Sequence, residues 1–85
     1  MTEQELKDQY ATLVKLEQAR RELDYNREVY AYLMDSDQTS HNIRIDAKHN
    51  LNVSTHSLVV LIDAEMLLIE TRISELEAEL NATTS

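Results

Sequence analysis

The sequence contains no glycine, no proline and no cysteine. An average chain of this length would hold about ten glycines and prolines together. Glycine permits tight reversals and proline fixes turns, so their absence favours long helices joined by one open connection. It also excludes phosphate sites that need a glycine-rich loop, such as the P-loop. The lack of cysteine excludes disulfides, thiol catalysis and cysteine-ligated zinc.

Basic residues are scarce, with 8 Lys and Arg against 16 Asp and Glu and a formal net charge of −8. Phosphate contacts require clustered cations, so nucleic acid is not expected as a partner. An anionic membrane surface is disfavoured for the same reason, and no apolar run is long enough to span a bilayer. The first residues do not resemble a secretion signal, which predicts a cytoplasmic protein or one within a particle assembled there.

The 85 residues are enough for one domain, 1–85, with a small core. Domains of this size often need a second source of stability, and without cysteine that source is not a disulfide. Association with another chain is then the expected second source of stability.

The fold is expected to be mainly α-helical. A first helix is predicted over residues 3–35, and its start has a clear signal. Thr2 and Glu5 have the spacing of a capping box, in which the Thr hydroxyl accepts from the Glu amide. Acidic residues near Asp35 oppose the helix dipole, so they favour an end there. Residues at steps of three and four form one stripe: Leu6, Tyr10, Leu13, Leu16, Ala19, Leu23, Asn26, Tyr30 and Leu33. Asn26 is either a solvated boundary residue or a buried amide that sets the register of a coiled coil.

The connection, residues 36–54, alternates apolar and polar residues, which predicts two short strands over 42–46 and 51–54. The turn would lie at Asp46–Asn50, with His49 or Asn50 in a left-handed conformation in place of glycine. The alternative is a flexible linker.

These strands would form a β-hairpin whose apolar residues share one face. The predicted register sets Ile43 opposite Val53 and Ile45 opposite Leu51. A two-stranded hairpin is marginal in water and needs a surface to pack on, which we expect another subunit to supply.

A second helix is predicted over residues 55–81, followed by a polar tail, 82–85. Its apolar residues alternate steps of three and four in the pattern of a coiled-coil seam. The seam consists of Val59, Ile62, Met66, Ile69, Ile73, Leu76 and Leu80. The two helices are therefore expected to form an antiparallel hairpin.

The first half of this second helix carries more apolar residues than one partner helix can cover. The additional residues are Leu58, Val60, Leu61, Ala64, Leu67 and Leu68. A helix that is apolar nearly all round must be buried nearly all round. We therefore predict a homo-oligomer joined through Leu58, Val60, Leu61, Leu67 and Leu68 and through the strand residues Ile43, Ile45, Leu51 and Val53, with another protein as the alternative partner.

Opposite charges suggest a register for the helical hairpin. If the helices are aligned antiparallel, with the end of the first beside the start of the second, cations of the first helix lie opposite anions of the second. The resulting pairs are Lys15 with Glu75, Arg20 with Glu70, and Arg27 with Asp63.

No residues have the pattern of a catalytic, cofactor or metal site, so we expect no enzyme activity and no cofactor. The three histidines, His41, His49 and His56, lie in or beside the connection without metal-ligand spacing on a helix. Tyr25 and Tyr32 share a helix face, and tyrosine is enriched at interfaces, so they join the predicted contact surface.

The order helix, β-hairpin, helix is similar to that of small prefoldin subunits. In that family coiled-coil arms extend from an oligomeric barrel of hairpins. The resemblance lies in the order of elements, and helices of about 50 Å and 40 Å by the 1.5 Å rise would make short arms.

Two functions fit the sequence. The first is a structural or protein-interaction module, an oligomeric scaffold, adaptor or assembly chaperone. The second is a small acidic inhibitor of the phage type, which blocks or sequesters a host factor through a basic site. The predicted second helix carries six acidic residues and only Arg72 as a cation, which is the feature that keeps the inhibitor hypothesis open. A small ligand bound between subunits is a third hypothesis.

Overall fold

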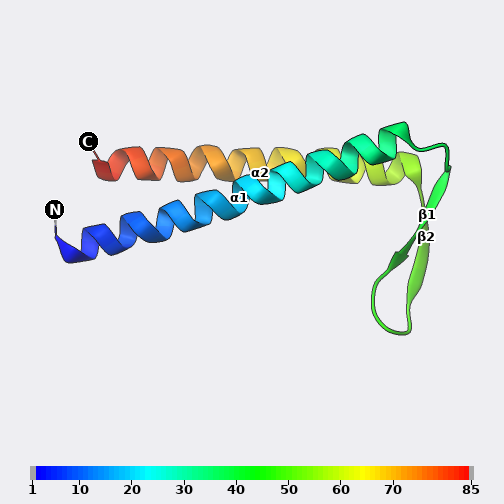
Figure 1. The fold of residues 1–85 in the computed structure, drawn as a ribbon, viewed down its shortest axis with the longest axis horizontal. Helices are drawn as coiled ribbons and strands as arrows, with labels where there is room; N and C mark the ends of the chain where they lie inside the picture. The colour runs from blue at the N-terminus through cyan, green and yellow to red at the C-terminus, as the bar shows by residue number, and fades with distance from the viewer. Residues whose placement is uncertain (1, 85) are drawn as a thin grey trace.

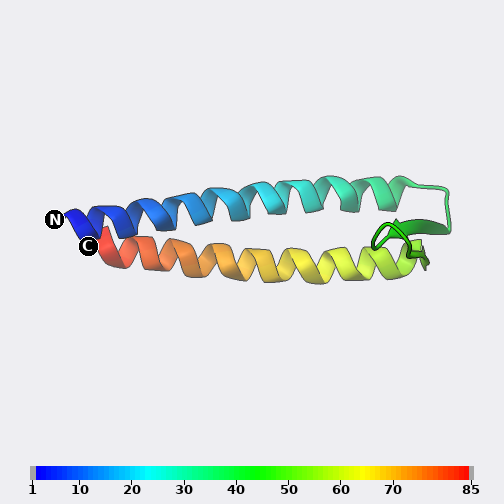
Figure 2. The same ribbon diagram turned by 90° about the horizontal axis from the view of Figure 1, so that it is seen from below.

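Two long helices pack side by side in opposite directions and are joined by a short β-hairpin (Figures 1 and 2). The structure is a computed structural model that describes residues 2–84, with the backbone alone for residues 83 and 84. The elements follow in the order α1 (Glu3–Asp35), β1 (Ser40–Arg44), β2 (Asn50–Ser54) and α2 (Thr55–Thr84). The predicted helical hairpin, with a β-hairpin in its connection, is confirmed.

The helix ends follow from local hydrogen bonds. At the start of α1 the Thr2 hydroxyl accepts from the Glu5 amide at 3.1 Å, as the capping box predicts. The start of α2 is capped by the Ser54 hydroxyl, which accepts from the Ser57 amide at 3.1 Å. The predicted end of α2 at residue 81 is wrong, because the helix continues to Thr84. No glycine or proline is present to stop it earlier.

The core lies between the helices and is made by the predicted seam of α2. Ile69 and Leu76 are buried against one side of α1, with Met66, Ile73 and Leu80 partly buried beside them. The buried apolar residues of α1 in this cluster are Leu16, Ala19 and Leu23.

The first part of the predicted α1 stripe is wrong. Leu6, Tyr10 and Leu13 are 54%, 70% and 43% exposed, whereas Thr12 is 7% exposed. Thr12 and Leu13 lie four and three residues before Leu16, and either spacing continues a helical stripe. Leu13 was predicted to be buried only because it is apolar. Thr12 tolerates burial because its hydroxyl donates to the Asp8 carbonyl at 3.0 Å.

Asn26 is half-buried, and its side-chain amide donates to the Glu22 carbonyl of its own helix at 2.7 Å. This bond satisfies the amide within α1. The interpretation of Asn26 as an amide that sets the register against α2 is therefore not supported.

The predicted register between the helices is also wrong. Arg20 Nη2 lies 3.1 Å from Glu77 Oε1, and Arg27 Nη2 lies 3.9 Å from Glu70 Oε1. Relative to the predicted pairs, each arginine meets the acid one heptad further along α2. A third pair joins Arg72 Nη1 to Glu22 Oε2 at 3.5 Å.

The error has a simple physical origin. The two arginines of α1 are seven residues apart, and Asp63, Glu70 and Glu77 repeat at the same interval. Sliding one helix by a heptad keeps both the charges and the apolar seams in contact. Neither pattern could distinguish the two registers.

A charge-reversal pair tests the observed register. Arg20→Glu should destabilise the hairpin modestly, because exposed ion pairs contribute about 0–1 kcal/mol and the variant adds a repulsion. Adding Glu77→Arg should restore the thermal stability measured by circular dichroism. Adding Glu70→Arg instead should not restore it, and rescue by that variant would support the predicted register, in which Arg20 faces Glu70.

The two strands pair antiparallel with Ile43 opposite Leu51 and His41 opposite Val53. The predicted register, Ile43 opposite Val53, was displaced by two residues. A shift of two keeps every side chain on its own face, so the alternation that predicted the strands could not fix the pairing.

Candidate functional site

One face of α2 is not covered by any other part of the chain that the structure describes. Val60, Leu61, Leu67 and Leu68 are 56%, 55%, 60% and 62% exposed, and Ala64 between them is also exposed. We call these five residues the outer face. They recur at helical spacing on the side of α2 away from the buried Ile69, since one neighbouring helix covers only one stripe. Leu58, predicted to belong with them, is half-buried.

Unpaired carboxylates border the outer face on both sides. Asp63 is three or four residues from Val60 and Leu67, and Glu65 has the same relation to Leu61 and Leu68, so these pairs are neighbours on the helix surface. Both acids are exposed, and within residues 2–84 neither forms an ion pair. Arg20 and Arg27 of α1 are seven residues apart, and the next position at that spacing is Met34. This position of α1 therefore offers Asp63 no arginine.

The β-hairpin exposes a second apolar surface. Ile43 and Leu51 lie opposite each other and are 37% and 54% exposed, and Ile45 is 65% exposed. We call these three residues the hairpin face. Ile45 continues the same face because its amide donates to the His49 carbonyl at 2.9 Å, extending the ladder by one pair.

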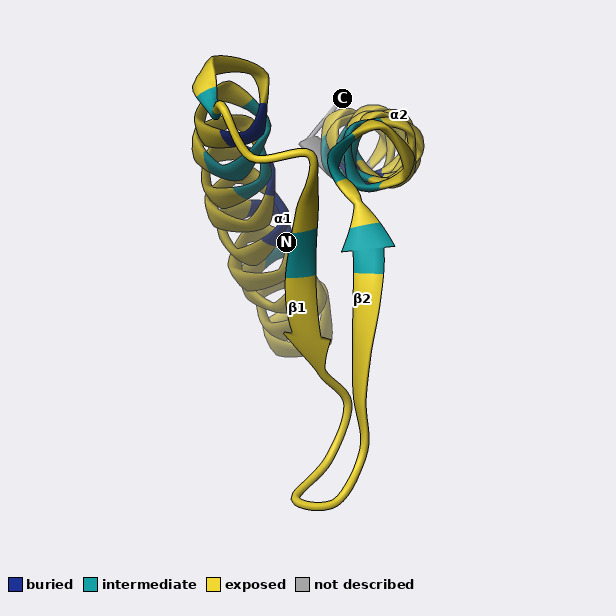
Figure 3. Cartoon of the chain, turned by 90° about the vertical axis from the view of Figure 1, so that its right-hand side faces the viewer, coloured by how far each residue is buried: buried dark blue, intermediate teal, exposed yellow. Residues whose placement is uncertain are grey.

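Only the base of the hairpin is partly covered by the helices. Val53 and His41, at the base, are of intermediate exposure, whereas the remaining strand residues are exposed (Figure 3). An isolated two-stranded hairpin of this kind is marginal in water. Two strands form as predicted, but the first lies at Ser40–Arg44 and not at 42–46, and most of their apolar side chains are exposed.

The turn of the hairpin is closed by Asp46 rather than by a left-handed residue. No described residue has positive φ, so the predicted left-handed His49 or Asn50 is wrong. Asp46 Oδ1 accepts from the Lys48 and His49 amides, each at 2.8 Å, and lies 2.7 Å from His49 Nδ1. An Asp side chain that bonds the backbone after it replaces the glycine that a tight turn would otherwise need.

These bonds favour the ionised form of Asp46. The Lys48 amide first, and then the His49 side chain, lower the pKa of the Asp46 carboxyl below its usual 3.8. Because the pKa is lowered in the folded hairpin, the stabilisation is complete above the unfolded pKa of about 3.9 and is lost as pH falls through the folded value.

We therefore expect the hairpin turn to persist at pH 4 and to loosen only in more acidic solution. The amide NMR shifts of Lys48 and His49 should titrate together, with a midpoint below 3.8. Asp46→Asn should abolish this titration. A midpoint at or above the usual value would show that the carboxylate does not hold the turn.

The two candidate tyrosines lie in different surroundings. Tyr32 is 65% exposed, and its ring lies 6.3 Å from the His41 ring, tilted by 57°. This contact joins α1 to the base of the hairpin. His41 Nε2 is buried and has no hydrogen-bond partner among the described residues. Tyr25 is 67% exposed.

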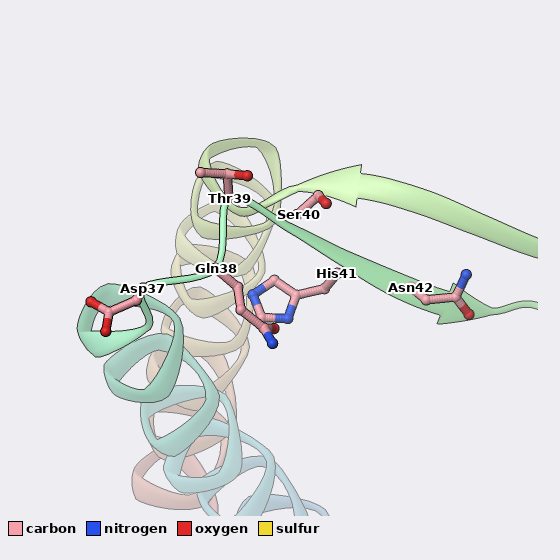
Figure 4. Close-up of a pocket in the computed structure, with 6 residues that line it drawn as sticks. All are labelled: Asp37, Gln38, Thr39, Ser40, His41 and Asn42. Carbon is pink, nitrogen blue, oxygen red and sulfur yellow. The ribbon is translucent and has the colours of Figure 1, made fainter.

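A hollow of about 590 Å³ lies beside the segment that joins α1 to β1. Its lining residues are Asp37, Gln38, Thr39, Ser40, His41 and Asn42. Their side chains point in different directions along the segment rather than toward one point (Figure 4). Across residues 2–84, no group of three or more His, Asp or Glu side chains is placed to hold a metal ion. The exposed apolar surfaces are therefore the stronger candidate site.

Comparisons with family models, curated proteins and solved structures found no match to this chain. The similarity to prefoldin subunits thus stays at the order of elements. Neither α1 nor α2, over the described residues, has a stretch sufficiently long and apolar to cross a bilayer.

Proposed function

We propose that this protein is a structural or protein-interaction module, a homo-oligomeric helical hairpin that acts as a scaffold, adaptor or assembly chaperone. The observation that carries the proposal is the outer face of α2. Its four large residues are each more than half exposed, although they are adjacent on one helix. Burying the exposed part of each of these side chains would contribute about 1 kcal/mol to the free energy of association. Monomeric proteins rarely leave an apolar patch of this kind exposed to water.

The hairpin face supports the same proposal. The β-hairpin has three exposed apolar residues and no third strand or covering helix within the described chain. Association of copies in a closed symmetric assembly would cover both surfaces at once, and a two-fold dimer is the commonest assembly of that kind.

Sedimentation equilibrium of the purified chain over a range of concentrations tests this proposal. We expect an oligomer at micromolar concentration that dissociates on dilution. A stable monomer throughout that range would refute self-association.

The alternative is a small acidic inhibitor of the phage type that binds and blocks or sequesters a host factor. The specific observation in its favour is the set of acids on α2 without an ion pair to any described residue. This set consists of Asp63, Glu65, Glu75 and Glu79. A monomeric chain that binds a basic protein site, with affinity that falls steeply as salt rises, would favour this function over the scaffold.

A further inference from the structure

The outer face of α2 reads the same in both directions along the helix. Its centre is Ala64, and a pair of large apolar residues lies at equal distance on each side: Val60 and Leu61 before it, and Leu67 and Leu68 after it. All five residues are exposed. In a two-fold interface each copy contributes the same surface, so that surface must match itself when its direction is reversed. A partner of another sequence imposes no such condition, and the symmetry of the face therefore favours a second copy of this chain.

The large residues of the outer face form two rows with Ala64 between them. Val60 and Leu67 are seven residues apart, as are Leu61 and Leu68, and residues at that spacing lie above one another on a helix. The distance between two packed helices depends on the side chains at their point of contact. The small side chain of Ala64 therefore allows a second helix to approach closely at the centre of the face.

The residues that follow the outer face set the direction of that second helix. Thr71 and Glu75 lie on the same side of α2 as Ala64, seven and eleven residues further along. The Thr71 hydroxyl donates to the Leu67 carbonyl of its own helix at 3.0 Å, so it can be covered without losing a hydrogen bond. Glu75 is exposed and forms no ion pair with a described residue. A parallel second copy would bring the two Glu75 carboxylates against each other, which is unfavourable.

An antiparallel second copy avoids this repulsion. With Ala64 opposite Ala64, residue 73 of one copy lies opposite residue 55 of the other, where α2 begins. Glu75 then lies just beyond the start of the other α2, and the two Glu75 residues are about 33 Å apart at 1.5 Å per residue. The β-hairpin leaves this approach open, because it extends to one side of the helix pair while α2 is exposed on the side away from α1 (Figure 3).

We propose that two copies pair through their outer faces, with the α2 helices antiparallel about a two-fold axis at Ala64. The inference rests on the proposed self-association and names the surface that mediates it. A two-fold axis perpendicular to the helices brings each row against the same row of the other copy. Val60 of each copy therefore packs on Leu67 of the other, and Leu61 of each copy packs on Leu68 of the other. These reciprocal contacts close the dimer.

The carboxylates beside the outer face weaken this dimer at low salt. Asp63 borders the row of Val60 and Glu65 borders the row of Leu61, so each lies at an edge of the interface near its counterpart in the other copy. Like charges repel, and salt screens charges that are exposed to solvent. Association of the original chain should therefore strengthen as salt rises, whereas binding of the acids to a basic site, the alternative function, would weaken.

Single cysteines test the geometry, since the chain has no thiol of its own. In Ala64→Cys the two thiols meet at the two-fold axis, where helix axes about 8–10 Å apart bring the Cα atoms within reach of a disulfide. In Glu75→Cys, the matched control on the same side of α2, the thiols are too far apart to join. Under mild oxidation Ala64→Cys should form a linked dimer at least about tenfold faster than Glu75→Cys, because thiols within one dimer have an effective concentration of about millimolar whereas separate chains meet at micromolar concentration.

Circular dichroism of both variants confirms that the helices are intact, and sedimentation equilibrium of the original chain shows whether it associates. If both variants form linked dimers equally fast, the α2 helices are not antiparallel and the contact is wrong. If the original chain associates but Ala64→Cys is linked no faster than Glu75→Cys, or association weakens as salt rises, the contact is wrong and self-association stands. If the original chain is itself monomeric, the contact and the proposed function both fail.

Discussion

Ile69→Lys is expected to abolish cooperative folding of the protein. Ile69 is 3% exposed and lies in the core between the helices with Leu23 and Leu76. Replacing it with an unpaired charge removes a buried alkyl group and desolvates an ammonium, at a cost of about 3–5 kcal/mol or more. A domain of this size has only about 4–13 kcal/mol of stability in total. Thermal melting followed by circular dichroism should show loss of the cooperative transition.

The adjacent residue supplies a matched control. Leu68→Lys makes a closely similar change one position away, but Leu68 is 62% exposed. That variant should keep its helical signal and its cooperative melt. Any loss of stability should be confined to the part that depends on protein concentration and so comes from association. If Ile69→Lys folded and melted like the original chain, the seam of α2 would be misassigned.

The double variant Leu61→Glu with Leu68→Glu is expected to convert the proposed oligomer into a folded monomer. Both side chains lie on the outer face, next to the unpaired Glu65. The change removes apolar burial of about 1 kcal/mol at each position and adds like charges, so the dissociation constant should rise by about 100-fold or more. Sedimentation velocity measures the change in assembly, and circular dichroism should show unchanged helix content.

A second double variant checks that the effect belongs to the outer face. Leu6→Glu with Tyr10→Glu also places two acids at exposed apolar positions, which are 54% and 70% exposed near the start of α1. It should associate as the original chain does. Retained association of the Leu61→Glu, Leu68→Glu variant would place the assembly surface elsewhere.

The elements themselves were predictable because local signals agree. The capping residue Thr2, the acids near Asp35 and the seam of α2 place three helix ends and the core face of α2 correctly. The alternation in the connection predicted two strands for the same reason. Each of these signals depends on residues close in sequence, where periodicity is informative.

The pairing between elements was less predictable, because the repeats that identify an element also make its registers equivalent. The helix pairs were wrong by one heptad, and the strand pairs were wrong by two residues. The choice between Thr12 and Leu13 failed similarly, since both steps suit a helix and only the packed partner distinguishes them. These errors reflect contacts between distant residues, about which local pattern says little.

The sequence predicted the exposure of the outer face, and the role of this face as an assembly surface stays a prediction. Val60, Leu61, Leu67 and Leu68 follow from counting the apolar stripes on α2 against the one stripe that α1 can cover. The unpaired state of Asp63 beside this face was not predicted. The predicted register paired Asp63 with Arg27, whereas in the observed register Arg27 pairs with Glu70.

Isotope-filtered NOE spectroscopy on a mixture of labelled and unlabelled chains tests the central claim most directly, because it separates contacts between copies from contacts within one copy. Contacts between copies should involve the methyl groups of Leu61 and Leu68, whereas the contacts of Ile69 with α1 should arise within one chain. If Ile69 and Leu76 instead contacted the α1 of another copy, and Leu61 and Leu68 contacted none, the helices would pair between chains and the hairpin with an exposed assembly face would be contradicted.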